Sequence, residues 1–418
     1  MSRITIVGSG AVGLCTAYFL HRAGYTVQVL EREAPQDVSG CSYGNAGMIV
    51  PSHFVPLAAP GVIQQGLKWL LNSKSPLYIK PRLNADLARW LWLFFRSANK
   101  QNVLRTGDQL FRLNQASRDL FAEMSKREGF EMDYKQRGLM MLYQTAAAEA
   151  EEIRLAEEAR ELGIEAEVLD RDQVQALEPE FQVGVRGGVH YHSDAHLNPA
   201  KFMGQLRNHL LDEGVIFHFG AEVKEVKYTG RRITHLLTPS GDISTDQVVL
   251  ALGTWTEGLA QQLGLRIPLQ GGKGYSFMLE NSPLQLHTPS ILCEPKLALT
   301  PMGKHLRVAG TMEIAGTNRT ISASRLQGIK EGVGEYLLNF DSEWMQAITP
   351  WVGLRPVSPD GLPYIGPSRA WDNLYLNTGH AMMGLSLAPV SGQLLAQLIM
   401  GQAVEFNTEI LSPDRFGR

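Results

Sequence analysis

Short apolar runs and an amphipathic stretch alternate at the start of the chain. Residues 4–7 are apolar except for Thr5, as expected of a strand buried on both faces of a parallel sheet. Apolar residues then recur at helical spacing over residues 11–23, and Gly24 stands where a helix ends in the left-handed conformation. Residues 26–30 form a second apolar run. This order predicts a right-handed βαβ unit.

Strand-like runs that suit the same parallel sheet return much later, at residues 215–219, 248–252 and 374–377. Its last helix is predicted over residues 389–400, with Pro389 in the first turn and Gly401 after the end. The domain built on this sheet is therefore predicted to be discontinuous.

Other runs have the pattern of a second, antiparallel sheet, at residues 138–143, 274–279, 297–300 and 306–309. Helices are predicted over residues 62–130 and, facing solvent, over residues 146–162, whereas residues 35–61 predict a long structured loop. The fold class is α/β, α+β overall: a Rossmann-like domain interleaved with a substrate domain of antiparallel sheet and helices. We assign the first domain to residues 1–60, 190–265 and 351–418, and the second to residues 61–189 and 266–350.

Composition narrows the class of protein. The 418 residues exceed one ordinary hydrophobic core, and 44% hydrophobic with 19% charged residues fits a soluble globular protein. A formal net charge of −3 without a long basic run argues against a nucleic-acid partner. Three widely separated cysteines fit a reducing, cytoplasmic compartment. No apolar run approaches the roughly 20 residues that a membrane-spanning helix needs.

The turn after the first strand carries the dinucleotide-binding fingerprint. Gly8, Gly10 and Gly13 stand at GxGxxG spacing, which serves a tight turn, a close approach of pyrophosphate and helix packing on the strand. The helix start supplies free N–H groups for the phosphates. Glu31 ends the next strand, where its carboxylate can accept hydrogen bonds from a ribose diol. These features predict a dinucleotide cofactor but do not separate FAD from NAD.

The chain resembles the D-amino-acid oxidase and glycine oxidase superfamily of flavoenzymes, and within it the bacterial D-amino-acid dehydrogenase group. The resemblance runs over nearly the whole chain. Its specific stretches are residues 4–31, 42–61 (SYGNAGMIVPSHFVPLAAPG), 249–255 (VLALGTW), 268–276 (PLQGGKGYS), 353–366 (GLRPVSPDGLPYIG) and 377–392 (NTGHAMMGLSLAPVSG).

The resemblance implies a non-covalent FAD whose flavin lies at the seam between the domains, with a loop of small residues along its edge and the start of the last helix near N1 and C2. The implied cofactor-binding residues are Gly8, Gly10, Ala11, Val12, Gly13, Glu31, Arg32, Ser42, Gly44, Asn45, Ala46, Gly47, Met48, Val223, Gly253, Trp255, Gly379, His380, Met383, Gly384, Leu385 and Ser386.

Three residues are candidates for substrate chemistry. A guanidinium binds a carboxylate through two N–H groups in one plane, and the resemblance places the family's carboxylate clamp at Arg355. Tyr275 is a second candidate for the carboxylate, with a half-buried strand tyrosine as the alternative. His53 could accept an ammonium proton, whereas an orienting or structural role is favoured for His380.

Two further groups of residues are a set of three histidines and two clusters of aromatic side chains. His190, His192 and His196 are crowded as metal ligands often are, but they alternate in a predicted loop, and no metal site is expected. Aromatic residues cluster at residues 69–71 and 90–95. Core packing is favoured for them, and a face that rests on a membrane or meets a quinone is the alternative.

The expected reaction is FAD-dependent oxidative deamination of an amino acid, in the D configuration by resemblance, with hydride transfer from Cα to flavin N5 and hydrolysis of the imine to a 2-oxo acid. The expected electron acceptor is a quinone or an electron-transfer chain. One alternative is a dehydrogenase or oxidase of secondary amines such as glycine, sarcosine, proline or hydroxyproline derivatives. Another is a non-catalytic flavin- or NAD-binding subunit of a larger complex.

Overall fold

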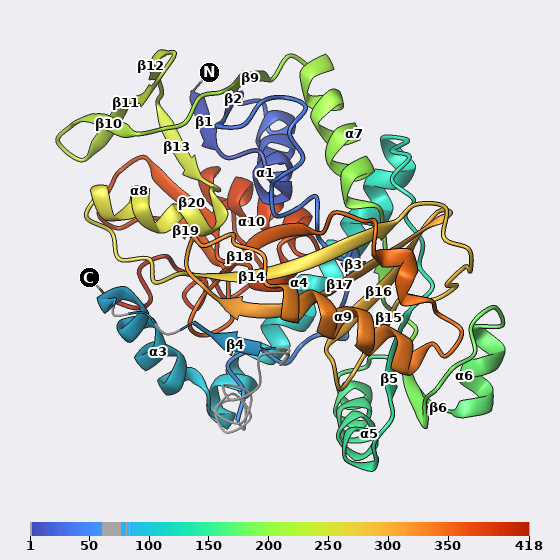
Figure 1. The fold of residues 1–418 in the computed structure, drawn as a ribbon. Coiled ribbons are helices and arrows are strands. Elements are labelled where there is room, and N and C mark those ends of the chain that lie inside the picture. Colours follow the sequence, from blue (N-terminus) through green and yellow to red (C-terminus); the bar gives the residue numbers. More distant parts are fainter. Residues whose placement is uncertain (1, 61–76, 81, 83, 418) are drawn as a thin grey trace.

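The computed structural model describes residues 2–60, 77–80, 82 and 84–417. Two main sheets organise these residues, one mostly parallel and one mostly antiparallel (Figure 1). The predicted fold class is confirmed. The division into two domains with the boundaries given above stays a prediction.

The parallel sheet contains all five runs that the sequence assigned to it. In spatial order its strands are β19 (Tyr364–Pro367), β20 (Leu374–Thr378), β13 (Gln247–Leu250), β1 (Arg3–Val7), β2 (Thr26–Glu31) and β9 (Ile216–Phe219). Only β19, at one edge, runs antiparallel to its neighbour. Since β1 lies between β2 and β13, the turn that follows β1 leaves the middle of the sheet at the carboxyl ends of the strands.

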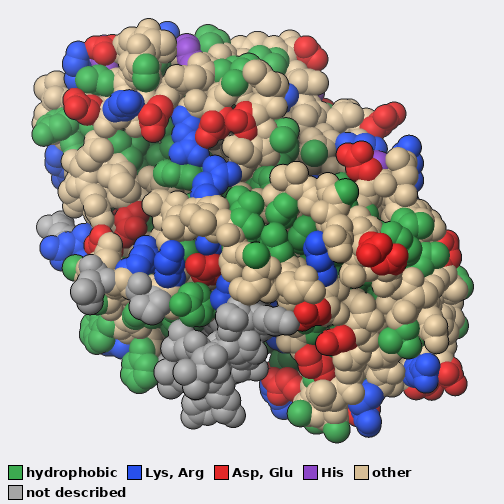
Figure 2. Space-filling view, viewed as in Figure 1, with side chains coloured by type: hydrophobic (Ala, Val, Ile, Leu, Met, Phe, Trp, Pro, Cys, Tyr) green, Lys and Arg blue, Asp and Glu red, His purple; other side chains and the backbone are tan. Residues whose placement is uncertain are grey.

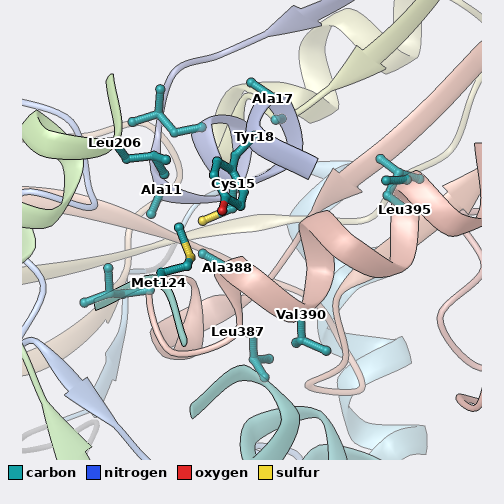
Figure 3. Close-up of a cluster of buried hydrophobic side chains, with 14 of the residues drawn as sticks. Ala11, Cys15, Ala17, Tyr18, Met124, Leu206, Leu387, Ala388, Val390 and Leu395 are labelled. Atoms are coloured by element: carbon teal, nitrogen blue, oxygen red, sulfur yellow. The ribbon is translucent and has the colours of Figure 1, made fainter. Parts of the chain in front are cut away.

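Helices cover one face of this sheet. The apolar sides of β1 and β2 pack under α1 (Ala11–Arg22), α7 (Pro199–Asp212), α10 (Ala388–Ile399) and the long α4 (Lys100–Arg127). Figure 3 shows Cys15 and Tyr18 of α1 near Ala388 of α10. The two helices cross so closely that a side chain at Gly392 would not fit, since a Cβ atom there would lie 2.7 Å from the carbonyl carbon of Cys15. This packing fixes the position of the first turn of α1.

The opposite face of the parallel sheet is covered by a small three-stranded sheet and a short helix. Strand β11 (Arg232–Thr238) lies between β10 (Glu225–Thr229) and β12 (Gly241–Ser244). Helix α8 (Thr256–Gln262) follows the 3₁₀ turn at Gly253–Trp255. The sheet is thus buried on both faces, as its uninterrupted apolar strands require.

The second sheet begins at β18 (Trp351–Val357) and continues through β14 (Gln270–Leu279), β17 (His305–Ile314), β16 (Leu297–Met302), β15 (Ser290–Leu292), β5 (Leu139–Tyr143), β7 (Gly187–Tyr191) and β6 (Ala166–Asp170). β4 (Leu77–Ile79) also pairs with β17. The sheet is antiparallel as predicted except at two pairs, β15 with β5 and β17 with β4. The helices of this part are α3 (Ala85–Ser97), α5 (Ala146–Glu161), α6 (Arg171–Leu177) and α9 (Ala323–Tyr336).

Several predicted elements need correction. Residues 62–130 are not wholly helical, because β4 lies among them, while residues 61–76, including the aromatic cluster at 69–71, lie outside the described residues. The predicted loop at 35–61 contains β3 (Met48–Ile49), which pairs with β8 (Ala195–His196). His196 lies on β8 and His190 lies on β7, so both stand on strands and not in the predicted loop. Helix α5 is only partly solvent-facing, since Glu152, Ala156 and Ala159 are buried.

The second aromatic cluster has two environments. Trp90 on α3 is buried and donates a hydrogen bond to the carbonyl of Val357, whereas Trp92 and Phe95 are 55% and 64% exposed. Core packing is thus the environment of part of the cluster only. Among the helices that the structure describes, none combines the length and the apolar character that a membrane crossing requires.

Candidate functional site

A cavity of about 1330 Å³ extends between the carboxyl ends of the parallel strands and the first strands of the second sheet. It begins at the turn after β1, passes the loop at residues 40–48 and reaches β18 and β17. The face of the molecule in Figure 2 carries acidic and basic side chains intermixed, without a field of one sign.

The glycine turn leaves room for a ligand at one point only. Gly8 has φ +108°, and a Cβ atom there would lie 2.6 Å from the carbonyl oxygen of Ala251. A Cβ atom at Gly13 would lie 1.9 Å from the oxygen of Gly8, so α1 packs directly on the turn. At Gly10 the nearest atom would be the Ser42 hydroxyl at 3.5 Å. Gly10 thus faces open cavity at the start of α1, which fits a pyrophosphate.

The end of β2 forms the next part of the wall. The Glu31 carboxylate accepts hydrogen bonds from the backbone N–H and the hydroxyl of Ser9, at 2.9 and 2.7 Å. It also accepts one from the N–H of Glu33 at 3.1 Å. The guanidinium of Arg32 lies 3.9 Å from the ring centre of Trp255. This end of the cavity suits an adenosine. It is lined by Glu31, Arg32, Val223 and Trp255.

The loop at residues 41–48 is held from the second sheet by Arg307, a residue that sequence reasoning missed. One nitrogen of its guanidinium donates to the carbonyls of Tyr43 and Asn45, at 2.7 and 2.6 Å. The guanidinium is buried, and this burial lowers its pKa to about 10. Asn45 also accepts a hydrogen bond from the N–H of Gly47 at 2.8 Å. Small residues and fixed carbonyls give this loop the flat, rigid edge that a flavin needs.

Arg355 lines the cavity on β18 and has no acidic partner among the residues that the structure describes. It donates to the carbonyl of Thr311 at 2.7 Å, and burial lowers its pKa. The neighbouring strand makes space for it, because a Cβ atom at Gly274 would lie 2.1 Å from its guanidinium. Thr311 has φ +61°, a strained backbone for a β-branched residue. The arrangement holds an uncompensated cation ready for an anionic ligand.

His53 lines the cavity and belongs to a chain of hydrogen bonds that the sequence did not reveal. Its Nδ1 lies 3.0 Å from the hydroxyl of Ser52, which donates to the Asp194 carboxylate at 2.5 Å. The backbone N–H of Ser52 donates to the other carboxylate oxygen at 3.1 Å. Burial lowers the pKa of His53 to about 4, with Lys296 contributing, and raises the pKa of Asp194 to about 7.

The tautomer of His53 follows from this chain. When the carboxylate of Asp194 is ionised, it takes the single hydroxyl proton of Ser52, and the hydroxyl oxygen then accepts from Nδ1–H of His53. Nε2 then carries the lone pair of a neutral ring. A neutral imidazole oriented in this way presents Nε2 as a hydrogen-bond acceptor to a ligand in the cavity.

Tyr275 lies elsewhere. Its side chain is buried in the apolar core of the second sheet, its hydroxyl accepts a hydrogen bond from the N–H of Ser322 at 3.2 Å, and it does not line the cavity. The reason is strand alternation, since Gly274 points toward Arg355 and the next residue must point away. The geometry does not support a role for Tyr275 in binding a carboxylate, and the alternative of a packed strand tyrosine fits it.

His380 lines the cavity, but its Nε2 lies 2.9 Å from the hydroxyl of Ser391 in α10, and burial lowers its pKa to about 3. An orienting role at the start of α10 fits these contacts. Among the other predicted cofactor residues, all line the cavity except Gly13, Gly47 and Gly379, which support the backbone around it. Residues that line the cavity without having been predicted include Cys41, Glu152, Lys296, Thr311, Met312 and Trp351.

Comparison with known proteins places these features in a family. The model of the family described as "DAO: FAD dependent oxidoreductase" matches residues 3–398. The D-amino acid dehydrogenase of Methylobacterium nodulans is 34% identical over 420 residues, which cover 99% of each chain. The D-amino acid dehydrogenase of Granulibacter bethesdensis is 34% identical over 411 residues, which cover 96% of each.

Solved structures share the fold. Glycine oxidase from Geobacillus kaustophilus superposes with a TM-score of 0.79 at 21% identity, covering 99% of both chains. L-proline dehydrogenase from P. horikoshii superposes with a TM-score of 0.75 at 18% identity, covering 99% of this chain and 97% of the other. The open position at Gly10, the Glu31 wall and the rigid loop at 41–48 agree with a bound FAD.

Proposed function

We propose that this chain, which belongs to the DAO family of FAD-dependent oxidoreductases, catalyses the oxidative deamination of a D-amino acid. One Cα–H bond and one N–H bond of the substrate are broken and a C=N bond forms. When FAD is bound, its flavin would accept the two electrons. Water then converts the imino acid to a 2-oxo acid and ammonia. The D configuration rests on the names of the relatives that are 32–34% identical.

The observation that carries this proposal is the guanidinium of Arg355 in the wall of the cavity, which has no acidic partner among the described residues. A partly buried cation without an anion is costly, and a substrate carboxylate would supply a partner. One guanidinium nitrogen is already fixed to the carbonyl of Thr311, which limits the directions from which the carboxylate can approach. Arg355 therefore binds and orients the substrate.

His53 acts on the amino group in this proposal. An amino acid in water carries an ammonium group, which must lose a proton before its Cα hydrogen can leave with the electron pair. The substrate binds as the free amine, its proton having passed to water. Because burial lowers the pKa of His53 to about 4, its ring stays neutral, and Nε2 accepts a hydrogen bond from the amino group while Ser52 with Asp194 holds the ring in the required tautomer. Ser52 and Asp194 are positioning residues.

Substrate size and charge follow from the rest of the wall. Met48, Met312 and Leu297 offer apolar surface, which favours neutral D-amino acids and cyclic imino acids of the proline type. Glu152 and Lys296 also line the cavity, so charged amino acids belong in any substrate panel.

The electron acceptor is proposed to be a quinone or an electron-transfer chain. Trp92 and Phe95 support this proposal, because two large apolar side chains exposed on one short helix favour contact with a lipid surface or an apolar partner. If reduced enzyme forms peroxide in air as fast as it reduces a quinone analogue, the protein is an oxidase instead.

The test of the proposed function is the absorption spectrum of the purified holoenzyme, followed without oxygen while single D- and L-amino acids are added. Bleaching of the oxidised flavin by D-amino acids, with formation of the 2-oxo acid, is expected. Bleaching by secondary amines alone would favour a secondary-amine dehydrogenase. A flavin that no substrate reduces would contradict the proposal and favour a non-catalytic subunit.

A further inference from the structure

The edge of the second sheet brings together three side chains that bind metals. Glu167 on β6 and His190 on β7 face each other across the strand pair, and His192 follows β7 directly. One ligand atom from each residue can be chosen so that all three lie within 4.8 Å of one another. None of the three lines the cavity, so the cluster is separate from the site described above. β6 is the last strand of the sheet, near α6 in Figure 1.

The ring of His190 is oriented by a backbone carbonyl. Its Nε2 lies 3.1 Å from the carbonyl oxygen of Arg137, and since a carbonyl can only accept, Nε2 must carry the proton. The lone pair of the neutral ring is then on Nδ1. A histidine whose second nitrogen donates to a carbonyl is the usual arrangement of a metal ligand, because this bond fixes the tautomer and the ring plane.

The remaining two ligands are close and adjustable. His192 Nε2 lies 3.2 Å from the Glu167 carboxylate, which is near the spacing of about 3.4 Å that ligands at 2.0–2.2 Å from a tetrahedral zinc ion would have. Their side chains are 34% and 54% exposed, so both can move to meet an ion and leave a direction open to water. His190 is buried, whereas the other two residues face solvent, so His190 is the ligand with the most fixed position.

We propose that Glu167, His190 and His192 form a binding site for a divalent transition-metal ion such as Zn²⁺, which links the edge strand β6 to β7. Two imidazoles and one carboxylate are a ligand set that zinc accepts, with water as the fourth ligand. No metal was expected from the sequence, because His190, His192 and His196 alternate in what was predicted to be a loop. The structure replaces His196, whose Nδ1 is buried without a partner, by Glu167 from a neighbouring strand.

Zn²⁺ binding to the holoenzyme, stripped with a chelator and then dialysed, tests this site by calorimetry. Wild-type protein is expected to bind one equivalent, and His192→Gln and Glu167→Gln are each expected to weaken binding about tenfold or more. His287→Gln is the matched control, since His287 also pairs with a glutamate, Glu180, at 3.7 Å but lacks a second histidine. Binding in this variant should equal that of wild type.

Two further measurements sharpen the test. Co²⁺ in place of Zn²⁺ should give the visible absorption of a four-coordinate ion in wild type and lose it in His192→Gln. The same Zn²⁺ concentration should raise Tm of wild type and of His287→Gln by equal amounts and that of Glu167→Gln by less. Absence of saturable binding in wild type, or equal binding in wild type and both ligand variants, would overturn the proposal.

Discussion

Two cationic groups with opposite surroundings lie at the two faces of strand β14: the partly buried Arg355 of β18 and the buried Lys273 of β14 itself. On one face Gly274 makes room for Arg355, which has no acidic partner among the described residues and lines the cavity. On the other face Lys273 lies 3.1 Å from Glu313, which also lies 3.6 Å from Arg325. A buried cation with its own carboxylate belongs to the fold, whereas a cation in the cavity wall without a carboxylate is available to a ligand.

The structural cluster should give the largest effect. Glu313→Gln removes the shared carboxylate and leaves two buried cations, so the free energy of unfolding should fall by about 3–5 kcal/mol. Chemical denaturation of the holoenzyme at fixed FAD concentration measures this. Asp242→Asn is the matched control, because Asp242 pairs with Lys227 at the exposed surface, where a loss of at most about 1 kcal/mol is expected. Equal losses in both variants would remove the contrast between the two faces.

The cation in the cavity should affect catalysis and leave the fold intact. Arg355→Leu should lose about 2–4 kcal/mol in kcat/KM, as when one member of a buried charge pair is removed. Arg355→Lys should recover only part of this, because a point charge cannot reproduce the planar fork. Steady-state kinetics with a quinone analogue measures both variants. Full activity in Arg355→Lys would show that only the charge matters.

Gly274→Ala should act on the same cation indirectly. The added Cβ atom would lie 2.1 Å from the guanidinium and must displace it, so kcat/KM should fall, by less than in Arg355→Leu. Gly334→Ala in α9 is the control, because nothing lies within 4 Å of a Cβ atom there. Kinetics of both variants decide the point. If Gly274→Ala keeps wild-type kcat/KM, the guanidinium does not need its present position.

Asp194 should act through the pH dependence of stability. Burial raises its pKa from 3.8 to about 7, so between these values the folded chain keeps a proton that the unfolded chain has released. This contribution to the free energy of unfolding falls as pH rises from about 4 to about 7, by at most about 1.4 kcal/mol per pH unit.

Asp194→Asn should remove this dependence, and the difference between wild type and variant in denaturant titrations should follow pH with that sign. The variant should also lose the limb near pH 7 in the pH profile of flavin reduction. A difference that stays constant from pH 4 to pH 7 would place the pKa of Asp194 near its ordinary value.

Local signals predicted the cofactor half of the molecule well. The GxGxxG turn, Glu31 and the apolar strands act within a few dozen residues, so their spacing in the sequence already fixes their geometry. The His53 hydrogen-bond chain and the flavin loop depend on distant partners. Asp194 meets Ser52 across 142 positions, and Arg307 meets Tyr43 across 264, contacts that no local pattern indicates.

The environment of Tyr275 follows from strand alternation once the register of β14 with β18 is known. Residues 271, 272 and 274 are glycines, and Arg355 pairs in register with Gly272, so the glycine side of β14 is the side that leaves space for an arginine. Strand alternation then directs Tyr275 to the opposite side. A residue's chemistry made Tyr275 a candidate, but its place in the strand decided its environment.

The central claim is that Arg355 binds the carboxylate of the substrate. It is tested most directly by comparing wild type with Arg355→Leu on two substrates, an amino acid and the amine that results from its decarboxylation. In the variant, kcat/KM for the amino acid should fall by a factor that corresponds to about 2–4 kcal/mol. For the amine it should change little, because the amine has no carboxylate to bind the guanidinium. Equal losses on both substrates would contradict it and make Arg355 a structural residue.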